Sequence, residues 1–435
     1  MNLKTSRRTL AKSAAFGVLS TTSFLKYAPA IMAQDSQLAV DYWHRYGGSR
    51  AETLNVLAEM FNEIHPEYKV SAISQGDIAE SNQKLRAAAA GGGLPAAISA
   101  DDYDITEYTA AGILTDLDPF VHDPELGFTD EEIAAFLPSQ FDRHKLAIYG
   151  DRRMAFPQAF SAMSFWWNED AIKAAGFDKP AETWTEFPDF LRKIVEANPG
   201  MTAWMEEDPG ARFMSIMKTY GVEWLKDDGV TPNFDAPEAL EILTWWKELY
   251  DEGLLQFTQS NKIEVFAAGQ TAIMLHSSSA GPALAEQVKD FTYNGGLPPQ
   301  GENTDTLRTE TYGSLNAVPT NDEALTKAGW EWVKWLVSPE AFAVWIPASN
   351  YFPSRTDLLE IPEIAAFYDA DPVALKLLQE VAPAATILSP SAALTEVRGT
   401  IVPTAIEEVM MGKYSPEEGV MKMQAESIAA VERAG

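Results

Sequence analysis

The sequence predicts an α/β fold in which a mostly parallel sheet is flanked by helices. Residues 38–42, 68–73 and 96–100 have the short apolar patterns of strands, and amphipathic helices are expected between them at 50–65 and 81–90. Strands that alternate with helices are typical of parallel sheets, because a parallel connection needs a long crossover. A length of 435 residues allows two or three such domains.

The composition narrows the classes of partner and chemistry. The chain carries 63 acidic and 33 basic residues, so nucleic acid and anionic membrane surfaces are not expected as partners. It has no cysteine, which excludes disulfides, thiolate metal sites and a cysteine nucleophile. The five histidines show no i,i+4 pairing of the kind that binds zinc. We therefore expect no metal and no cofactor, and no membrane span beyond the N-terminal segment.

Residues 1–33 are predicted to be a twin-arginine-type signal peptide. This segment has a basic start with Arg7-Arg8, followed by Leu10 and Lys12, then a mildly apolar stretch and small residues up to Ala33. A first helix of the mature fold is the alternative, but these three features occur together. We expect cleavage after Ala33 and export of the folded protein to the periplasm.

Polar residues follow the first three predicted strands. In open parallel sheets, ligands bind beyond the carboxyl ends of the strands. This rule places residues 44–48, 76–78 and the pair Asp101-Asp102 on one rim. One of the two aspartates is expected to cap the helix predicted at 105–111, and the other to accept hydrogen bonds from ligand hydroxyls.

The stretch 146–177 combines strand, turn and helix signals with small hydroxyls and aromatic residues. It predicts a strand at 146–149, a turn, a second extended piece to Pro157 and a polar loop with Ser161 and Ser164. Asn168 is expected to cap a helix at 169–175 that ends at Gly176. Small hydroxyls and aromatic rings between a strand and a helix suit a small polar ligand. An ordinary connection with core aromatics is the alternative interpretation.

Further candidates lie in the second half of the chain. Trp204 is the tryptophan expected near a ligand, whereas the other aromatics of this region are expected in the core. Ser277–Ser279 precede a helix predicted at 283–288, and one of them is expected to cap it. A strand predicted at 310–319 carries Gly313.

Several segments resemble family 1 extracellular solute-binding proteins, the sugar and glycerol-phosphate binders of ABC importers. Gly150, Pro157, Ser161, Trp167 and Asn168, followed by Ala175-Gly176-Phe177, fall on a pattern of that family, which has Tyr-Tyr where this chain has Trp166-Trp167. Similar segments are Trp43-His44, 61–66, 84–88, 111–119, 265–274 and 349–355. The resemblance extends in short blocks over nearly all of the chain after residue 33.

The resemblance implies two lobes, each with a mostly parallel sheet, and a ligand cleft between them. The expected N-terminal lobe is 34–144 plus 272–319, and the expected C-terminal lobe is 145–271 plus 320–435. The implied function is a monomeric periplasmic receptor that binds a carbohydrate-like solute and delivers it to the permease subunits of an ABC importer. Hinge closure would trap the solute.

The expected ligand-binding residues come from three sources: the strand-end rim, the serines and aromatics described above, and the family resemblance. They are His44, Asp101, Asp102, Ser161, Trp166, Trp204, Ser278, Ser279, Gly313, Tyr351 and Arg398. In glycerol-3-phosphate-type members a tyrosine and a glutamate contact the ligand after the second and third strands. The matching positions here are Ile78 and Asp102, and Ile78 departs from the pattern. Around an anionic ligand, Arg398, Arg355 or His44 would be expected.

An enzyme is the alternative to a receptor. The sequence shows no Gly-x-Ser-x-Gly, His-Glu-x-x-His or Walker motif, so no catalytic residue is assigned. A pair of carboxylates leaves no such signature, so an exported glycoside hydrolase or lyase remains the second hypothesis. A polysaccharide adhesion module is the third.

Overall fold

The computed structural model describes residues 37–145, 147–302, 304 and 306–434. The segment Gln37–Gly435 forms one compact unit. The expected signal peptide, residues 1–33, lies outside the described residues. Within the described ranges, no helix is both long enough and apolar enough to cross a membrane.

The first part of the chain has the predicted alternation of strands and helices. It runs through β1 (Leu38–His44), α1 (Gly48–Ile64), β2 (Tyr68–Ser74), α2 (Ile78–Gly91) and β3 (Ala97–Ala100). β1 pairs in parallel with both β2 and β3, so it lies between them. α3 (Asp102–Ala110) follows directly after β3, which leaves the carboxyl end of this strand at the start of a helix.

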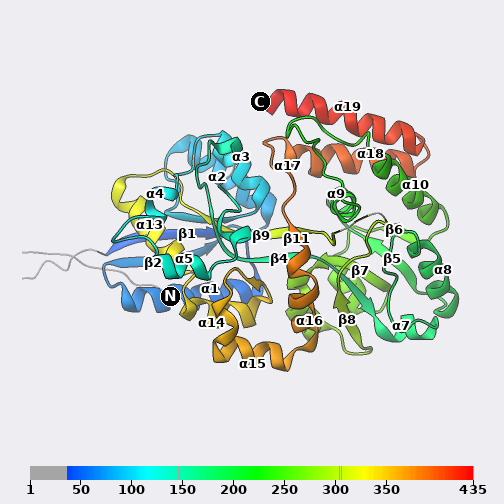
Figure 1. Cartoon of the computed structure of the whole chain (residues 1–435), viewed down its shortest axis with the longest axis horizontal. Helices are drawn as coiled ribbons and strands as arrows, with labels where there is room; N and C mark the ends of the chain where they lie inside the picture. The colour runs from blue at the N-terminus through cyan, green and yellow to red at the C-terminus, as the bar shows by residue number, and fades with distance from the viewer. Residues whose placement is uncertain (1–36, 146, 303, 305, 435) are drawn as a thin grey trace, which may run out of the picture. The chain divides into compact units, whose positions relative to one another are not determined.

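One continuous sheet runs through the described chain in the order β2-β1-β3-β9-β4-β7-β5-β6 (Figure 1). Its two ends are parallel, because β7 (Thr271–Ser277), β5 (Thr202–Glu206) and β6 (Leu255–Phe257) also pair in parallel. The antiparallel strands β9 (Thr309–Ala317) and β4 (Phe156–Asn168) join the two parallel parts. β8 (Tyr293–Gly296), β10 (Phe352–Pro353) and β11 (Ala385–Thr386) pair at the sides of this path.

The stretch 146–177 differs from the prediction in its first half. Ala147–Tyr149 form a 3-10 turn, η1, and not a strand. The predicted polar loop is the interior of β4, in which all 13 residues are buried. Serine and alanine weaken the strand pattern, but the buried hydroxyl of Ser164 has a backbone partner: its Oγ donates to the carbonyl of Ala162 at 3.2 Å. The prediction for the second half is confirmed, since Asn168 caps α7 (Glu169–Ala174).

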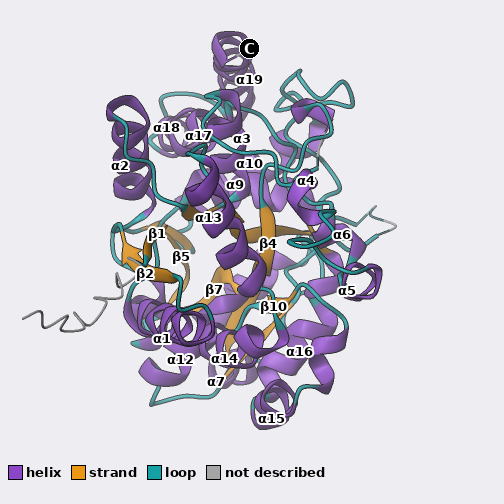
Figure 2. Ribbon diagram, turned by 90° about the vertical axis from the view of Figure 1, so that its left-hand side faces the viewer, coloured by secondary structure: helices purple, strands orange, loops and turns teal. Residues whose placement is uncertain are grey.

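Helices cover the strands on both sides (Figure 2). Besides those already named they are α4 (Asp118–Val121), α5 (Asp130–Ala135), α6 (Pro138–Phe141), α8 (Phe187–Ala197), α9 (Pro209–Thr219), α10 (Pro237–Asp251), α11 (Lys262–Ala267), α12 (Gly281–Gln287), α13 (Glu323–Trp335), α14 (Pro339–Ser349), α15 (Pro362–Ala370), α16 (Pro372–Glu380), α17 (Leu394–Glu396), α18 (Val402–Met410) and α19 (Pro416–Ala434). Short turns are η2 (Ser278–Ala280), η3 (Asp357–Glu360), η4 (Ala382–Ala384) and η5 (Val397–Ile401), the last a π-helical turn.

Two large aromatic cores pack against the two parallel parts of the sheet. The core beside β1 is built from α1, α13 and α14, and there Trp332 meets Phe61 edge to face with ring centroids 5.4 Å apart. The core beside β5 is built from α8, α9, α10 and α18, and Trp204 meets Trp246 in the same way at 5.4 Å. Edge-to-face pairs are a preferred aromatic geometry, so these rings fix how the helices pack on the sheet.

The two cores are connected through β4, β9 and β11. The first half of β4 pairs with β9, and the second half pairs with β7 and β8. β11 pairs with the start of β9 and precedes the segment that leads to α17. The strands that join the two parts of the molecule therefore lie side by side.

Candidate functional site

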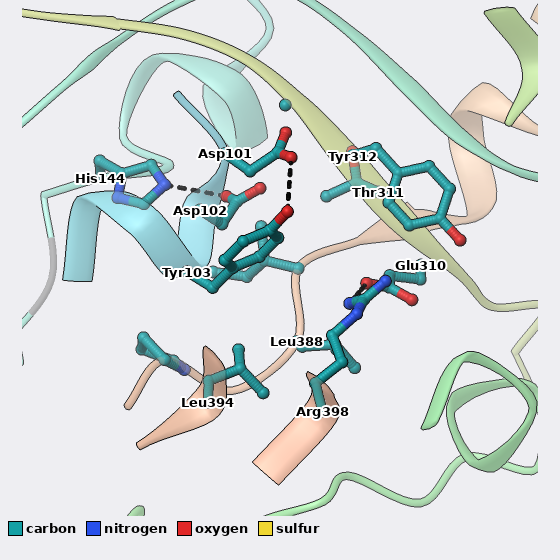
Figure 3. Close-up of a pocket in the computed structure, with 13 residues that line it drawn as sticks. Asp101, Asp102, Tyr103, His144, Glu310, Thr311, Tyr312, Leu388, Leu394 and Arg398 are labelled. Carbon is teal, nitrogen blue, oxygen red and sulfur yellow. Dashed lines mark hydrogen bonds and ion pairs between the residues drawn. The ribbon is translucent and has the colours of Figure 1, made fainter. Parts of the chain in front are cut away.

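A small polar cavity lies where residues of both parts of the molecule meet (Figure 3). Its volume is about 20 Å³, which is room for about one water molecule. It is lined by Asp101, Asp102, Tyr103, His144, Glu310, Thr311, Tyr312, Gly313, Ile387, Leu388, Pro390, Leu394 and Arg398. Four of the residues predicted from the sequence, Asp101, Asp102, Gly313 and Arg398, meet here.

Asp101 is the N-cap residue of α3 and is held by a tyrosine and an arginine. Its backbone N–H donates to Asp104 Oδ2 at 3.1 Å. Its carboxylate accepts the Tyr103 hydroxyl at 2.9 Å and pairs with Arg45, which also bonds Asp104 at 3.0 Å. The expectation that one of the two aspartates caps this helix is confirmed for Asp101. The same carboxylate also faces the cavity.

Asp102 is fixed by two residues that come from far along the chain. Arg143 Nε donates to Asp102 Oδ1 at 2.8 Å, Arg143 Nη2 binds Oδ2, and His144 Nε2 lies 2.8 Å from Oδ1. Burial alone would raise the pKa of Asp102, but Arg143 and His144 outweigh it and hold this pKa well below its usual range. Asp102 is therefore an ionised, oriented acceptor at neutral pH.

We expect Asp102 to make the protein sensitive to acid. Its folded-state pKa is depressed, so its contribution to the free energy of unfolding is present above the pKa of the unfolded chain, about 3.9. This contribution is lost as the pH falls below that value. In the wild type, the free energy of unfolding should therefore fall between pH 5 and pH 2 by on the order of 1–3 kcal/mol more than it does in Asp102→Asn.

Urea unfolding at a series of pH values measures this difference. Asp251→Asn is a suitable control, because Asp251 forms an i,i+4 pair with Lys247 on the surface. Parallel profiles for the wild type and Asp102→Asn would contradict the assignment.

Arg398 enters the cavity from the π-helical turn η5. Its guanidinium pairs with the carboxylate of Glu310 and lies over the rings of Tyr103 and Tyr312, at 5.7 and 5.9 Å from their centroids. Glu310 also accepts the Ser215 hydroxyl. A Cβ at Gly210 would collide with the carbonyl of Arg398, so this glycine allows α9 to approach the turn. The cavity therefore combines fixed carboxylates, a guanidinium and two aromatic rings.

This set of groups is suited to polyhydroxylated molecules. Oriented carboxylates accept hydrogen bonds from hydroxyls, a guanidinium donates several in a fixed fork, and aromatic rings pack on the apolar faces of sugars. Asp101, Asp102 and Gly313 come from the β3 and β9 side, whereas Leu394 and Arg398 come from the other side. A solute bound here would contact both parts of the protein.

The serines and Tyr351 lie apart from this cavity. Ser279 lines a second cavity together with Arg50 and His276. Ser278 is fully buried, and its Oγ accepts the N–H of Ala162 at 3.2 Å. Tyr351 is buried below the guanidinium of Arg50, 5.5 Å from its ring centroid.

Four other predicted residues do not line the first cavity. His44 is buried at the end of β1, where burial lowers its pKa to about 4 and its Nδ1 accepts the N–H of Tyr46 at 3.2 Å. Ser161 is buried within β4. Trp166 and Trp204 are fully buried in the hydrophobic cores. Ile78, the position that departs from the family pattern, is 42% exposed at the start of α2 and does not line this cavity either.

Arg355, one of the residues expected around an anion, is held elsewhere. Its Nε donates to Asp357 Oδ1 at 3.0 Å and its Nη1 to the carbonyl of Val337 at 3.3 Å.

Sequence reasoning missed most of the residues that hold the aspartates. Arg45 lies within the range 44–48 that was placed on the rim, but it was not named as a candidate. Arg143 and His144 lie 41 and 42 positions from Asp102 and belong to no recognisable pattern. Glu310 and Tyr312 precede Gly313 on β9, and the pairing of β9 with β3 brings this strand beside the end of β3.

One group of the described residues could hold a metal ion, although no metal was expected from the sequence. His65, Glu67 and Glu331 each place a ligand atom within 4.8 Å of the others. Two of these residues follow α1, and Glu331 comes from α13, so sequence spacing could not reveal the group. His65 Nδ1 lies 3.4 Å from Glu67 Oε1, which accounts for part of the arrangement without a metal.

Two α/β lobes that share a polar cavity at their junction define the class of bacterial solute-binding proteins. Residues 56–374 match the family described as bacterial extracellular solute-binding protein, and the chain belongs to this family. It is similar to the sn-glycerol-3-phosphate-binding periplasmic protein UgpB of Pectobacterium atrosepticum, with 22% identity over 90% of this chain and 91% of that one. UgpB of Yersinia enterocolitica is 24% identical over 88% of this chain and 89% of its own length.

Solved structures share the fold over most of the chain. UgpB from Mycobacterium tuberculosis in complex with glycerophosphocholine has a TM-score of 0.78 at 18% identity, and covers 91% of this chain and 98% of its own. The cyclic alpha-maltosyl-1,6-maltose binding protein from Arthrobacter globiformis has a TM-score of 0.77 at 18% identity. The match covers 91% of this chain and 100% of that protein. The predicted two-lobed α/β fold is therefore confirmed.

Proposed function

We propose that this protein is the periplasmic receptor of an ABC importer and that it captures a sugar, polyol, glycoside or glycerol-phosphate-like solute between its lobes. The observation that carries the proposal is the polar cavity, whose lining comes from both parts of the molecule. Family membership supports the receptor role, since the family is one of solute-binding proteins. The names of the relatives, which bind glycerol phosphates and oligosaccharides, support the class of solute.

Ligand entry would require the lobes to separate. A cavity of about 20 Å³ does not admit a monosaccharide, so solute binding would require the lobes to lie further apart than in this structure, and closure would enclose the solute in that wider cleft. Core packing supports a division in which α13 and α14 belong with β1, whereas β7 belongs with β5. We propose this division in place of the one expected from the sequence, which assigned 320–435 to the second lobe and 272–319 to the first.

The carboxylates of the cavity favour binding over hydrolysis. A carboxylate-dependent glycosidase needs one carboxyl group that stays protonated as the general acid. Asp102 is held ionised, and Glu310 is paired with Arg398. Burial raises the pKa of Asp104 to about 6, but this residue does not line the cavity, and its oxygens are bonded to Arg45 and Asn82. We therefore retain the receptor and not the enzyme.

The proposed location and partner follow from the same role. The UgpB relatives of Pectobacterium atrosepticum and Yersinia enterocolitica are named as periplasmic proteins, and the twin-arginine-type segment at Arg7-Arg8 supports export of the folded chain. The partners would be the importer's permease subunits and the solute, and the receptor would act as a monomer without a cofactor.

A thermal-shift screen of the purified protein tests this function. The panel contains mono- and disaccharides, polyols, sn-glycerol 3-phosphate and glycerophosphodiesters. A solute at a hundred times its Kd should add about 2.7 kcal/mol to the free energy of unfolding, which raises the midpoint visibly. One class of solute that stabilises the protein and is recovered unchanged by mass spectrometry is the expected result. A stabilising compound that is consumed over time would instead support the enzyme.

A further inference from the structure

A second polar cavity lies between the start of α1 and the turn η2. Its volume is about 290 Å³, which is large enough for a phosphate or carboxylate group with its attached carbons. The polar side chains that line it are Ser49, Arg50, His276, Ser279 and Glu286. Glu286 is exposed to solvent, whereas Arg50 is partly buried. Like the first cavity, this one is lined by residues from both parts of the molecule.

Arg50 has hydrogen-bonding capacity that the protein does not use. Both of its hydrogen bonds come from Nη2, one to the carbonyl of Ser279 and one to that of Ser349 at 3.5 Å. Among the described residues no carboxylate forms an ion pair with Arg50, and its Nε and Nη1 have no hydrogen-bond partner. A partly buried guanidinium without a counter-ion is unfavourable, and its free N–H groups match the geometry of an oxyanion.

His276 adds a second unsatisfied group to the same cavity. Its Nδ1 is buried and has no hydrogen-bond partner among the described residues. Two cations that act electrostatically on His276, Lys262 and Arg212, are both paired with Glu206. Burial, together with these cations, holds the pKa of His276 well below its usual range, so the imidazole is neutral. A neutral imidazole still donates one N–H to an anion.

Tyr351 links this cavity to the first one. Its ring lies below Arg50. Its ring also meets the ring of Tyr46 edge to face, with centroids 6.5 Å apart, and Tyr46 directly follows Arg45, the ion-pair partner of Asp101. The Tyr351–Tyr46 contact and the Arg45–Asp101 ion pair therefore connect the walls of the two cavities.

We propose that the cavity at Arg50 and His276 is an oxyanion subsite and that the captured solute carries a phosphate or carboxylate group. The inference rests on the proposed function, because it assigns the anionic end of the solute bound between the lobes. Arg50 would bind the oxyanion through Nε–H and Nη1–H, and His276 and the serine hydroxyls would complete the hydrogen bonds. The hydroxylated end of the solute would face Asp101 and Asp102.

Calorimetric titration of the purified protein with inorganic phosphate, and separately with acetate, tests the subsite. The variants are Arg50→Gln and His276→Asn, and Arg192→Gln is the matched control because Arg192 is exposed and paired with Asp189 and Glu252. Circular dichroism verifies that each variant is folded. We expect phosphate or acetate to bind the wild type and to bind Arg50→Gln about 10- to 100-fold more weakly, with a smaller loss in His276→Asn and none in Arg192→Gln. The stronger of the two probes identifies the class of anion.

Two results would overturn the proposal: binding of neither anion to the wild type, or equal binding to Arg50→Gln and the wild type. Failure of the proposed subsite can be distinguished from failure of the proposed receptor function. Tight binding of a neutral sugar without any anion would refute the subsite and support the receptor. Arg50-dependent anion binding without any effect of sugars or polyols would support the subsite and refute the carbohydrate class.

Discussion

Replacing Glu206 with glutamine is expected to lower the free energy of unfolding by about 3–5 kcal/mol. Glu206 is fully buried, with Oε1 2.6 Å from Lys262 Nζ and Oε2 3.2 Å from Arg212 Nε. Burial alone would raise the pKa of Glu206, but Lys262 and Arg212 outweigh it and lower this pKa, so the carboxylate is ionised. Glutamine would leave Arg212 without its buried carboxylate and Lys262 with only the more distant Glu207, at 4.0 Å.

Urea unfolding at neutral pH measures this loss. Glu252→Gln is the matched control, because Glu252 forms the same kind of ion pair with Arg192, at 2.6 Å, but both side chains are about 40% exposed. Exposed pairs contribute about 0.2–1 kcal/mol, so the control should change little. If Glu206→Gln were as stable as Glu252→Gln, the buried cluster would not stabilise this lobe as described.

Substituting alanine for Gly313 is expected to weaken solute binding by about 10- to 100-fold, the equivalent of one lost charge-assisted hydrogen bond. A Cβ at this position would lie 2.7 Å from Asp101 Oδ1 and 3.0 Å from the carbonyl of Ala100. The backbone of β3 cannot move easily, so the Asp101 carboxylate must shift away from Arg45 and Tyr103. The cavity would then lose one of its fixed acceptors.

Titration of the solute identified by the screen into Gly313→Ala measures this effect. Gly91→Ala is the control, because no atom lies within 4 Å of a Cβ built at Gly91. The variant should keep most of its stability, since overpacking by one methyl group costs about 1–3 kcal/mol. An affinity within twofold of the wild type would show that Asp101 does not contact the solute.

The sequence was sufficient for the parts of the fold with strong periodicity. The elements from β1 to β3 follow from apolar spacing, since each strand is short and each helix has one apolar face. β4 could not be predicted, because it is buried along its whole length and carries serines at interior positions. Its stability comes from neighbouring strands that are distant in sequence, and a local pattern cannot show such neighbours.

The candidate site was predictable only in part, because several of its residues are brought together from distant parts of the sequence. The rim argument placed Asp101 and Asp102 correctly at the end of β3, because it depends on topology alone. The partners Arg143 and His144 are brought to Asp102 by tertiary packing. Aromatic residues were ambiguous, since core and cleft tryptophans have the same sequence pattern, and Trp204 lies in a core.

A distance measurement between the two lobes tests the central claim most directly. The chain has no cysteine, so spin labels can be attached at Ile148→Cys and Val230→Cys. These exposed residues, 54% and 59% accessible, line the same groove of about 350 Å³, one from each part of the molecule. The account predicts a long average distance without solute and a single short distance once the solute from the screen is saturating. A distance that stays the same at saturation would contradict capture by closure of the lobes.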